Sequence, residues 1–293
     1  MKKLVVISGK GGTGKTTITS SLAYLSKGKR IADCDVEAPN LNLLLNNKII
    51  DEKLYVGGSI AKVDESLCID CGKCREYCRF DAISEEILID PLKCEGCGTC
   101  KYVCPKDAIK MEDEETGYIY TSEIERGNFV YAKLNIGADA AGKVVTEIRK
   151  EIENYSNEND LIIIDGAPGV GCVVIASITN CDMAVIVTEP TQSGLSDFKR
   201  IFSLVKQFNI KPYVVINKYD INIDMTREIK RYCKEEGIKN IKKVPFDSMV
   251  NKSLKENKTI VEYPDTKACK SIKDIWIDIN KKMGGNYNEN SNS

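Results

Sequence analysis

The chain has 293 residues, enough to bury a large core, and its formal net charge is −1. The 42 basic and 43 acidic residues are mixed along the whole length, which argues against a nucleic-acid partner. No apolar stretch is long enough to cross a bilayer, and the N-terminus enters a predicted strand rather than a signal peptide. We therefore expect a cytoplasmic protein with no membrane partner. Histidine is absent, which excludes the commonest general base and zinc ligand.

A glycine-rich motif follows the first predicted strand, which is the apolar run Leu4 to Ile7. The motif reads Gly9-Lys10-Gly11-Gly12-Thr13-Gly14-Lys15-Thr16-Thr17. A helix is predicted to follow it, from Thr16 to about Ser26. Strand, turn and helix N-terminus together aim backbone N–H groups at an anion, so this stretch predicts a phosphate-binding loop. In such a loop Lys15 reaches the terminal phosphates and Thr16 ligates Mg²⁺.

The next elements alternate less regularly. A short strand is predicted over Arg30 to Cys34, and it brings the carboxylates of Asp33-Cys34-Asp35 to the carboxyl end of the sheet. A third strand is predicted near Leu54 to Ala61. Beyond a cysteine-rich stretch, we expect irregular or paired strands from Gly117 to about Ile136 and a helix from Asp139 to Tyr155.

An α/β alternation then resumes, with apolar runs typical of strands buried on both faces. Further strands are predicted over residues 161–165, 183–188, 213–217 and 241–244, and helices over 194–208 and 225–236. The pattern predicts an α/β fold: a mostly parallel sheet with helices on both faces. The final helix, Lys267 to Met283, has its apolar residues at helical spacing, which fits packing on the sheet better than a membrane-surface role.

Eight of the thirteen cysteines lie between Val63 and Met111, in two copies of one unit spaced 26 residues apart. Each copy has the spacing Cys-x₂-Cys-x₂-Cys-x₃-Cys, and Pro105 follows the last cysteine, as in bacterial two-cluster ferredoxins. In that arrangement the fourth cysteine of each run serves the other [4Fe-4S] cluster. The first predicted ligand set is Cys68, Cys71, Cys74 and Cys104. The second predicted ligand set is Cys94, Cys97, Cys100 and Cys78.

Two Cys₄ zinc sites are the alternative, which we disfavour because zinc modules seldom use an interleaved run. Arg79 stands where the second copy has Pro105, which leaves open how the first run's cluster is shielded and its potential. We predict a discontinuous ATPase domain over 1–62 and 112–283, a small α+β ferredoxin-like domain inserted at 63–111, and a disordered tail over 284–293.

The phosphate loop, the Asp33-Cys34-Asp35 segment and Asp165-Gly166-Ala167-Pro168-Gly169 together resemble the MinD/ParA/Mrp superfamily of deviant P-loop ATPases, which includes the nitrogenase iron protein. The cysteine-rich stretch narrows the resemblance to MinD-superfamily members that carry an inserted two-cluster ferredoxin domain. The resemblance covers roughly residues 1 to 283.

The resemblance implies a role for each matching residue. Lys10 reaches across an ATP-sandwiched dimer to the partner's nucleotide, and Asp35 orients or activates the attacking water. Asp165 holds the Mg²⁺ shell with Thr16, and Gly169 senses the γ-phosphate. We thus expect Lys10, Lys15 and Asp35 to be catalytic. The expected nucleotide ligands are Gly11, Gly12, Thr13, Gly14, Lys15, Thr16, Thr17, Gly169, Asn217 and Pro245.

The alternatives are that Lys10 is a solvated surface lysine and that Asp35 only caps the following turn. The implied partner is a second copy or a related ATPase, joined in an ATP-dependent homodimer or heterodimer. A redox or apo-protein partner is expected but not identified by the residues.

The residues alone leave the choice between adenine and guanine open. Asn217-Lys218-Tyr219-Asp220 fits the Asn-Lys-x-Asp pattern by which many GTPases read guanine. The resemblance implies adenine, with Asn217 and the Val244-Pro245-Phe246 loop around it, and we favour ATP. Cys172 follows the switch-like Pro168-Gly169-Val170-Gly171, which raises the possibility of a third, intersubunit metal site.

Three functions are consistent with these features. The leading hypothesis is an ATP-driven redox protein, because one chain carries both a hydrolytic switch and cysteines for two clusters. The second is an ATPase that assembles or carries iron–sulfur clusters or metal, although Mrp-type carriers use a late Cys-x-x-Cys pair and none follows Cys104. The third is a ParA- or MinD-like positioning ATPase, which the near-neutral charge disfavours.

Overall fold

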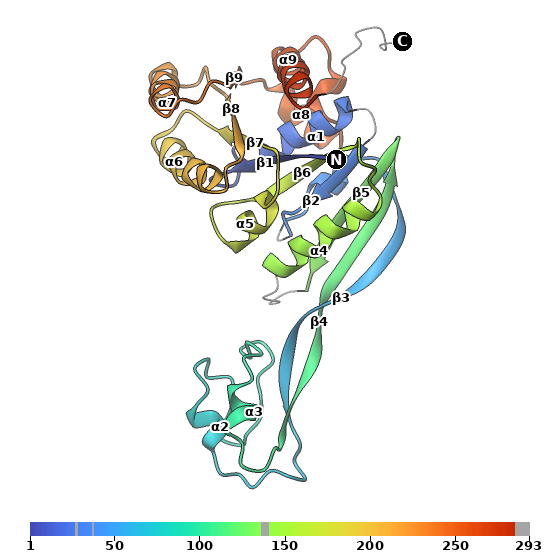
Figure 1. Cartoon of the computed structure of the whole chain (residues 1–293), viewed down its shortest axis with the longest axis vertical. Coiled ribbons are helices and arrows are strands. Elements are labelled where there is room, and N and C mark those ends of the chain that lie inside the picture. The colour runs from blue at the N-terminus through green and yellow to red at the C-terminus, as the bar shows by residue number, and fades with distance from the viewer. Residues whose placement is uncertain (27–28, 37, 136–140, 285–293) are drawn as a thin grey trace.

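The computed structural model describes residues 1–26, 29–36, 38–135 and 141–284, which form a layered α/β body with a long arm (Figure 1). One nine-stranded sheet runs through it in the order β3-β4-β5-β2-β6-β1-β7-β8-β9. Its strands are β1 (Lys2–Ser8), β2 (Lys29–Asp33), β3 (Asn47–Val63), β4 (Ile109–Ile124), β5 (Gly127–Leu134), β6 (Leu161–Pro168), β7 (Met183–Thr188), β8 (Lys211–Asn217) and β9 (Ile241–Val244). From β5 to β9 all neighbours in the sheet are parallel, whereas β4 is antiparallel to both β3 and β5. The predicted α/β fold with a mostly parallel sheet is confirmed.

Helices cover both faces of the parallel part. They are α1 (Lys15–Leu25), α4 (Ala141–Asn154), α5 (Cys172–Ile178), α6 (Gln192–Gln207), α7 (Ile223–Glu235), α8 (Met249–Lys255) and α9 (Lys267–Lys282), with short 3-10 turns η1 (Leu41–Leu43) and η2 (Ile260–Glu262). Strand β1 shows why its apolar run is continuous. Val5 and Ile7 pack in the core under α4 to α7, while Leu4 and Val6 face α1 and α9 on the other side.

The predicted elements of the parallel part agree with the structure to within a few residues at each end. The differences lie at the antiparallel edge. The third strand runs from Asn47 to Val63 rather than 54–61, and the stretch after Gly117 belongs to β4 and β5, which pair with each other. Pairing over so many residues depends on a partner far along the chain, which local propensity does not reveal. The predicted tail beyond Gly284 and the first two residues of the helix predicted from Asp139 lie outside the described residues.

Strands β3 and β4 extend well beyond the sheet as a twisted two-stranded ribbon (Figure 1). The pairing of β5 with β4 ends at Leu134 and Gly117, whereas β3 and β4 stay paired with each other as far as Val63 and Ile109. The ribbon begins at two register shifts around Val56, where Thr116 Oγ1 accepts a hydrogen bond from Gly57 N (2.9 Å) and donates one to Tyr55 O (3.1 Å). Thr116 thus satisfies backbone groups that the shifts leave unpaired.

Residues 64–108 form a small body at the far end of this ribbon (Figure 1). It contains two one-turn helices, α2 (Lys73–Glu76) and α3 (Thr99–Val103), and an isolated bridge between Ile83 and Ile89. Its apolar side chains make a cluster separate from the two cores of the main sheet, and Cys74 and Cys100 lie in it. This body therefore has its own small core.

Helix α9 packs against the sheet side that also carries α1. It buries Ala268, Cys269, Ile272, Ile275, Trp276 and Ile279. Tyr213 on β8 donates a hydrogen bond to Asp278 (2.9 Å) and so ties the helix to the sheet. This agrees with the prediction that the final helix packs on the sheet, because its apolar face is already covered. Among the described residues, no helix has both the length and the apolarity needed to cross a membrane.

We predict that Trp276→Ala lowers the free energy of unfolding by about 3 to 5 kcal/mol, because it removes a large side chain from a closed core. Urea unfolding measures this change. Lys270→Ala on the exposed face of the same helix is the control and should change stability little. If Trp276→Ala left stability unchanged and instead weakened binding to lipid vesicles, α9 would be a membrane-surface helix.

Candidate nucleotide and cysteine sites

The phosphate loop joins the end of β1 to the start of α1, at the point where the sheet order changes direction. Strand β1 lies between β6 and β7, which connect to opposite halves of the sheet, and α/β proteins bind ligands at such a point. Gly12 and Gly14 have φ angles of 78° and 90°. A Cβ atom on Gly14 would lie 2.3 Å from Asn217 Nδ2, so both the backbone conformation and the contact require glycine here.

A pocket of about 480 Å³ lies beside this loop. The predicted site residues that line it are Gly11, Gly12, Gly14, Lys15, Thr16, Thr17, Asp35, Asn217 and Pro245. Val250, Leu254 and Ile272 give it an apolar wall that the sequence did not indicate. Lys10, Thr13, Asp165 and Gly169 lie outside the lining. Thr13 is buried beneath the loop, and its hydroxyl has no hydrogen-bond partner among the described residues.

Lys15 is the centre of a buried charged cluster at the bottom of the pocket. Its Nζ lies 2.9 Å from Asp165 Oδ2 and 3.6 Å from Asp35 Oδ2. Thr16 Oγ1 donates to Asp165 Oδ2 (2.9 Å) and Thr19 Oγ1 to Asp165 Oδ1 (2.6 Å). Burial acts to lower the pKa of Lys15, but the surrounding carboxylates outweigh it and hold the pKa above its usual value. The lysine therefore stays charged and fixed between the ends of β2 and β6.

Asp33 is a member of this cluster to which sequence reasoning gave no role. It is 1% exposed, and its two oxygens accept hydrogen bonds from Asp35 N (3.0 Å) and Leu41 N (3.3 Å). Burial, and then the nearby charge of Asp165, raise its pKa well above the usual range for a carboxyl group. Asp33 thus shapes the loop that holds Asp35. Thr19, one helical turn after Lys15, is a second member of the cluster that the sequence did not indicate.

Lys10 points away from the pocket of its own chain. Its Nζ lies 2.7 Å from Glu189 Oε1 and donates a hydrogen bond to Ser193 Oγ (3.0 Å). Lys218 Nζ approaches the other oxygen of Glu189 at 3.7 Å. Lys10 is therefore an anchored side chain rather than a freely solvated one, held at the start of α6.

Asn217 links β8 to the phosphate loop, since its Nδ2 donates to Thr13 O at 2.8 Å. Asp220, the last residue of the GTPase-like pattern, accepts a hydrogen bond from Phe246 N at 2.7 Å and does not line the pocket. Gly169 N donates to Ser8 O at 2.9 Å, and Gly169 has a φ angle of 97°. Gly169 is thus tied to the end of β1, next to the start of the phosphate loop.

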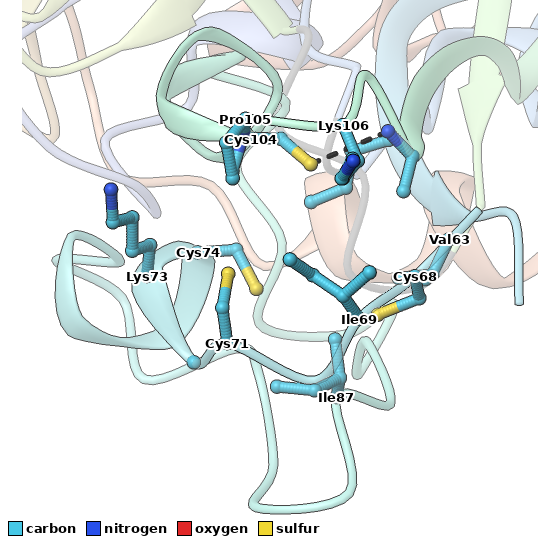
Figure 2. A pocket seen from close by; sticks show the side chains of 13 residues that line it. Val63, Cys68, Ile69, Cys71, Lys73, Cys74, Ile87, Cys104, Pro105 and Lys106 are labelled. Atoms are coloured by element: carbon cyan, nitrogen blue, oxygen red, sulfur yellow. Dashed lines mark hydrogen bonds between the residues drawn. The ribbon is translucent and has the colours of Figure 1, made fainter.

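The eight clustered cysteines line two pockets in the body at the end of the ribbon. One pocket is lined by Cys68, Cys71, Cys74 and Cys104 (Figure 2). The other is lined by Cys78, Cys94, Cys97 and Cys100. Each pocket therefore takes three cysteines from one repeat and one from the other, the same two sets that the spacing predicts. Figure 2 shows Cys104 entering from the side opposite Cys71 and Cys74, with its Sγ accepting a hydrogen bond from Ala108 N (3.3 Å).

Across the described residues, no three Cys, Asp or Glu side chains make a group that could hold a metal ion. The two ligand sets, and the choice of iron–sulfur clusters over zinc, therefore stay predictions.

The remaining cysteines have different surroundings. Cys34, Cys181, Cys233 and Cys269 are buried, and Cys172 is exposed at the first turn of α5. Burial raises the pKa of Cys181 to about 11, as expected for a small buried thiol. The intersubunit metal site suggested for Cys172 stays a prediction.

The model of the CobQ/CobB/MinD/ParA nucleotide-binding domain matches residues 4–260 of the chain. The chain belongs to this family. The match includes the phosphate loop, both aspartate segments and the whole cysteine-rich body, so family membership accounts for the nucleotide pocket but does not by itself assign the cysteines.

The chain is also similar to curated relatives and to solved structures. An uncharacterized protein of Methanocaldococcus jannaschii is 38% identical over 279 residues, covering 94% of this chain and 95% of its own. An iron–sulfur cluster carrier protein of Pyrococcus furiosus is 24% identical, covering 93% of this chain and 83% of its own. The cell division ATPase MinD of P. furiosus has the same fold, with a TM-score of 0.59 at 20% identity over 96% of this chain and 99% of that chain.

We predict that Asp33→Asn changes the pH dependence of stability. Because the folded pKa of Asp33 is raised, the wild-type protein loses stability as pH rises from about 4, the usual carboxyl pKa, through the higher folded value. The variant lacks this loss, so its melting temperature relative to wild type should be similar at pH 4 and higher at pH 8. Calorimetry across this range measures the difference.

Asp278→Asn is a control, for which we expect the opposite change of stability with pH. Although burial opposes the change, bonds from Lys282 (2.8 Å) and Tyr213 (2.9 Å) lower the pKa of Asp278. The wild-type protein therefore gains stability from Asp278 as pH rises, and this variant should lose stability relative to wild type at pH 8. Equal pH profiles for Asp33→Asn and wild type would contradict the electrostatic account of the cluster.

Proposed function

We propose that this protein is a Mg²⁺-dependent ATPase in which a dimeric nucleotide switch is coupled to electron transfer through two [4Fe-4S] clusters. One observation carries the proposal. The two four-cysteine pockets lie at the end of a ribbon whose strands β3 and β4 belong to the same sheet as the phosphate loop. A movement at the nucleotide therefore has a continuous structural connection to the cysteines.

ATP fits the nucleotide pocket better than GTP. Reading guanine by the Asn-Lys-x-Asp pattern requires the last carboxylate to face the base, whereas Asp220 does not line the pocket and accepts a hydrogen bond from Phe246 N at Oδ1. The apolar wall of Val250, Leu254 and Ile272 suits the flat face of a base without selecting guanine.

The charged cluster supports roles in hydrolysis. We assign Mg²⁺ to Thr16 and Asp165, which are joined at 2.9 Å, and the phosphates to Lys15, which would then leave Asp165. Asp35 lines the pocket and is the carboxylate able to orient the attacking water. Lys10 is assigned to the nucleotide of a partner subunit, because in its own subunit it turns away toward Glu189.

The cysteine pockets suit iron–sulfur clusters in their donor chemistry. Each offers four thiols on short loops, and Gly72 and Gly98 begin the one-turn helices at φ angles of 70° and 73°. Backbone N–H groups such as Ala108 N already point at a sulfur. Such clusters supply one-electron transfer, and the domain 63–111 would be a ferredoxin-like module.

A cluster-carrying ATPase is the second candidate, favoured by the relatives named as iron–sulfur cluster carriers. In this reading the cysteines release their clusters to an acceptor protein. A positioning ATPase is the third and is supported least, because α9 keeps its apolar residues buried.

We predict about eight iron atoms per chain when the protein is purified without oxygen, with an electron paramagnetic resonance signal after reduction. Cys104→Ser removes a ligand from one pocket only, so its iron content should fall to about half. Iron analysis measures both values. Cys172→Ser, an exposed cysteine outside both pockets, is the matched control and should keep all the iron.

Zinc in place of iron would contradict the cluster assignment. Loss of iron in Cys172→Ser would instead support the third, intersubunit site.

A further inference from the structure

A groove of about 580 Å³ lies on one flank of the body at the end of the ribbon. Its walls are the last residues of β3, Ile60 to Val63, and the segment from Glu86 to Pro91. Neither the nucleotide pocket nor the cysteine pockets include this space. We call it the flank groove.

The flank groove borders both cysteine pockets. It shares Val63, Cys68 and Ile87 with the pocket of Cys68, Cys71, Cys74 and Cys104. It shares Ala61 and Ile89 with the other pocket. Only the first pocket contributes a thiol, that of Cys68, so a molecule in the groove would touch a ligand of the first set.

The groove combines an apolar floor with an acidic rim. Glu65, Asp70 and Glu86 are exposed at its edge. Lys62 is the one basic side chain in the described lining, and its Nζ is already paired with Glu112 Oε2 at 2.5 Å. The rim therefore presents net negative charge to a binding partner. Leu88, 62% exposed, adds an uncovered apolar side chain.

We propose that the flank groove is the docking site of a basic redox protein that exchanges electrons with the cluster beside Cys68. An apolar centre with a charged rim is the usual anatomy of a transient protein interface, and the acidic rim selects a partner of opposite charge. One electron leaves the reduced chain and converts a metal centre of the partner from its oxidised to its reduced form, and no bond is formed or broken. The inference rests on the proposed redox function.

Cytochrome c, a basic haem protein, is a suitable probe. The full-length chain is reduced with dithionite, freed of excess reductant, and mixed with ferric cytochrome c at several salt concentrations. Glu65→Lys/Glu86→Lys should slow haem reduction about tenfold or more at low salt, with the difference fading as salt rises. Calorimetric titration should show a matching loss of affinity for cytochrome c, a readout that needs no electron transfer.

Glu76→Lys/Glu115→Lys is the matched control, since it changes the net charge equally at exposed positions outside the groove. It should keep both rate and affinity near the wild-type values. Leu88→Ser should also slow haem reduction, whereas Leu92→Ser, 81% exposed and outside the groove, should not. Asp70 is left unchanged, because its Oδ1 accepts a hydrogen bond from the Cys68 thiol.

Equal slowing by both charge-reversal pairs would overturn the docking site, because net charge alone would then explain the effect. A wild-type rate and affinity in Glu65→Lys/Glu86→Lys would overturn it as well. An uncharged quinone tests a small-molecule acceptor: if the groove variants slow quinone reduction as much as haem reduction, the groove does not select a protein. A chain that binds cytochrome c through the groove but holds no iron would contradict the redox function and leave the groove intact.

Discussion

The buried ion pair between Lys15 and Asp165 is the interaction on which the rest of the structure depends. It joins the phosphate loop after β1 to the end of β6, and Asp33 and Asp35 bring the end of β2 to the same point. Three carboxyl groups around one ammonium repel one another in a place with little water, and burial together with this repulsion raises the pKa of Asp33. A bound Mg²⁺ would relieve that repulsion, and a triphosphate would draw Lys15 away from Asp165. We therefore expect this cluster of charges to rearrange when nucleotide binds.

The same sheet connects this cluster to the arm formed by β3 and β4. Strand β2 lies between β6 and β5, and β5 pairs with β4, which continues into the ribbon. The root of the ribbon is irregular, with two register shifts and Thr116 bridging the backbone, so it is the point in the arm best suited to bend. The nucleotide pocket and the two cysteine pockets at the far end are therefore parts of one connected structure.

Local signals in the sequence predicted the parallel sheet and the two cysteine sets. The glycine positions of the loop and the continuous apolar runs such as 161–165 report on single elements, and the 26-residue repeat with its fourth-cysteine exchange reports on a motif of fixed spacing. The contact between Lys10 and Glu189 spans distant segments, and the burial of Asp33 depends on what packs over it. The length of the arm depends on the pairing of residues 56–63 with residues 109–115, and the flank groove depends on segments that meet only in the fold. These features arise only from contacts between distant parts of the chain, so no local pattern in the sequence predicts them.

The most direct test of the coupling is the reduction potential of the clusters, measured by electron paramagnetic resonance with and without MgATP, with iron counted on the same sample. The account predicts a shift of potential with MgATP and full retention of iron. It also predicts a smaller effect of MgGTP and no effect in Lys15→Ala, which cannot respond to the phosphates. Identical potentials with and without MgATP, or iron passing faster to an apo-protein when MgATP is added, would contradict it.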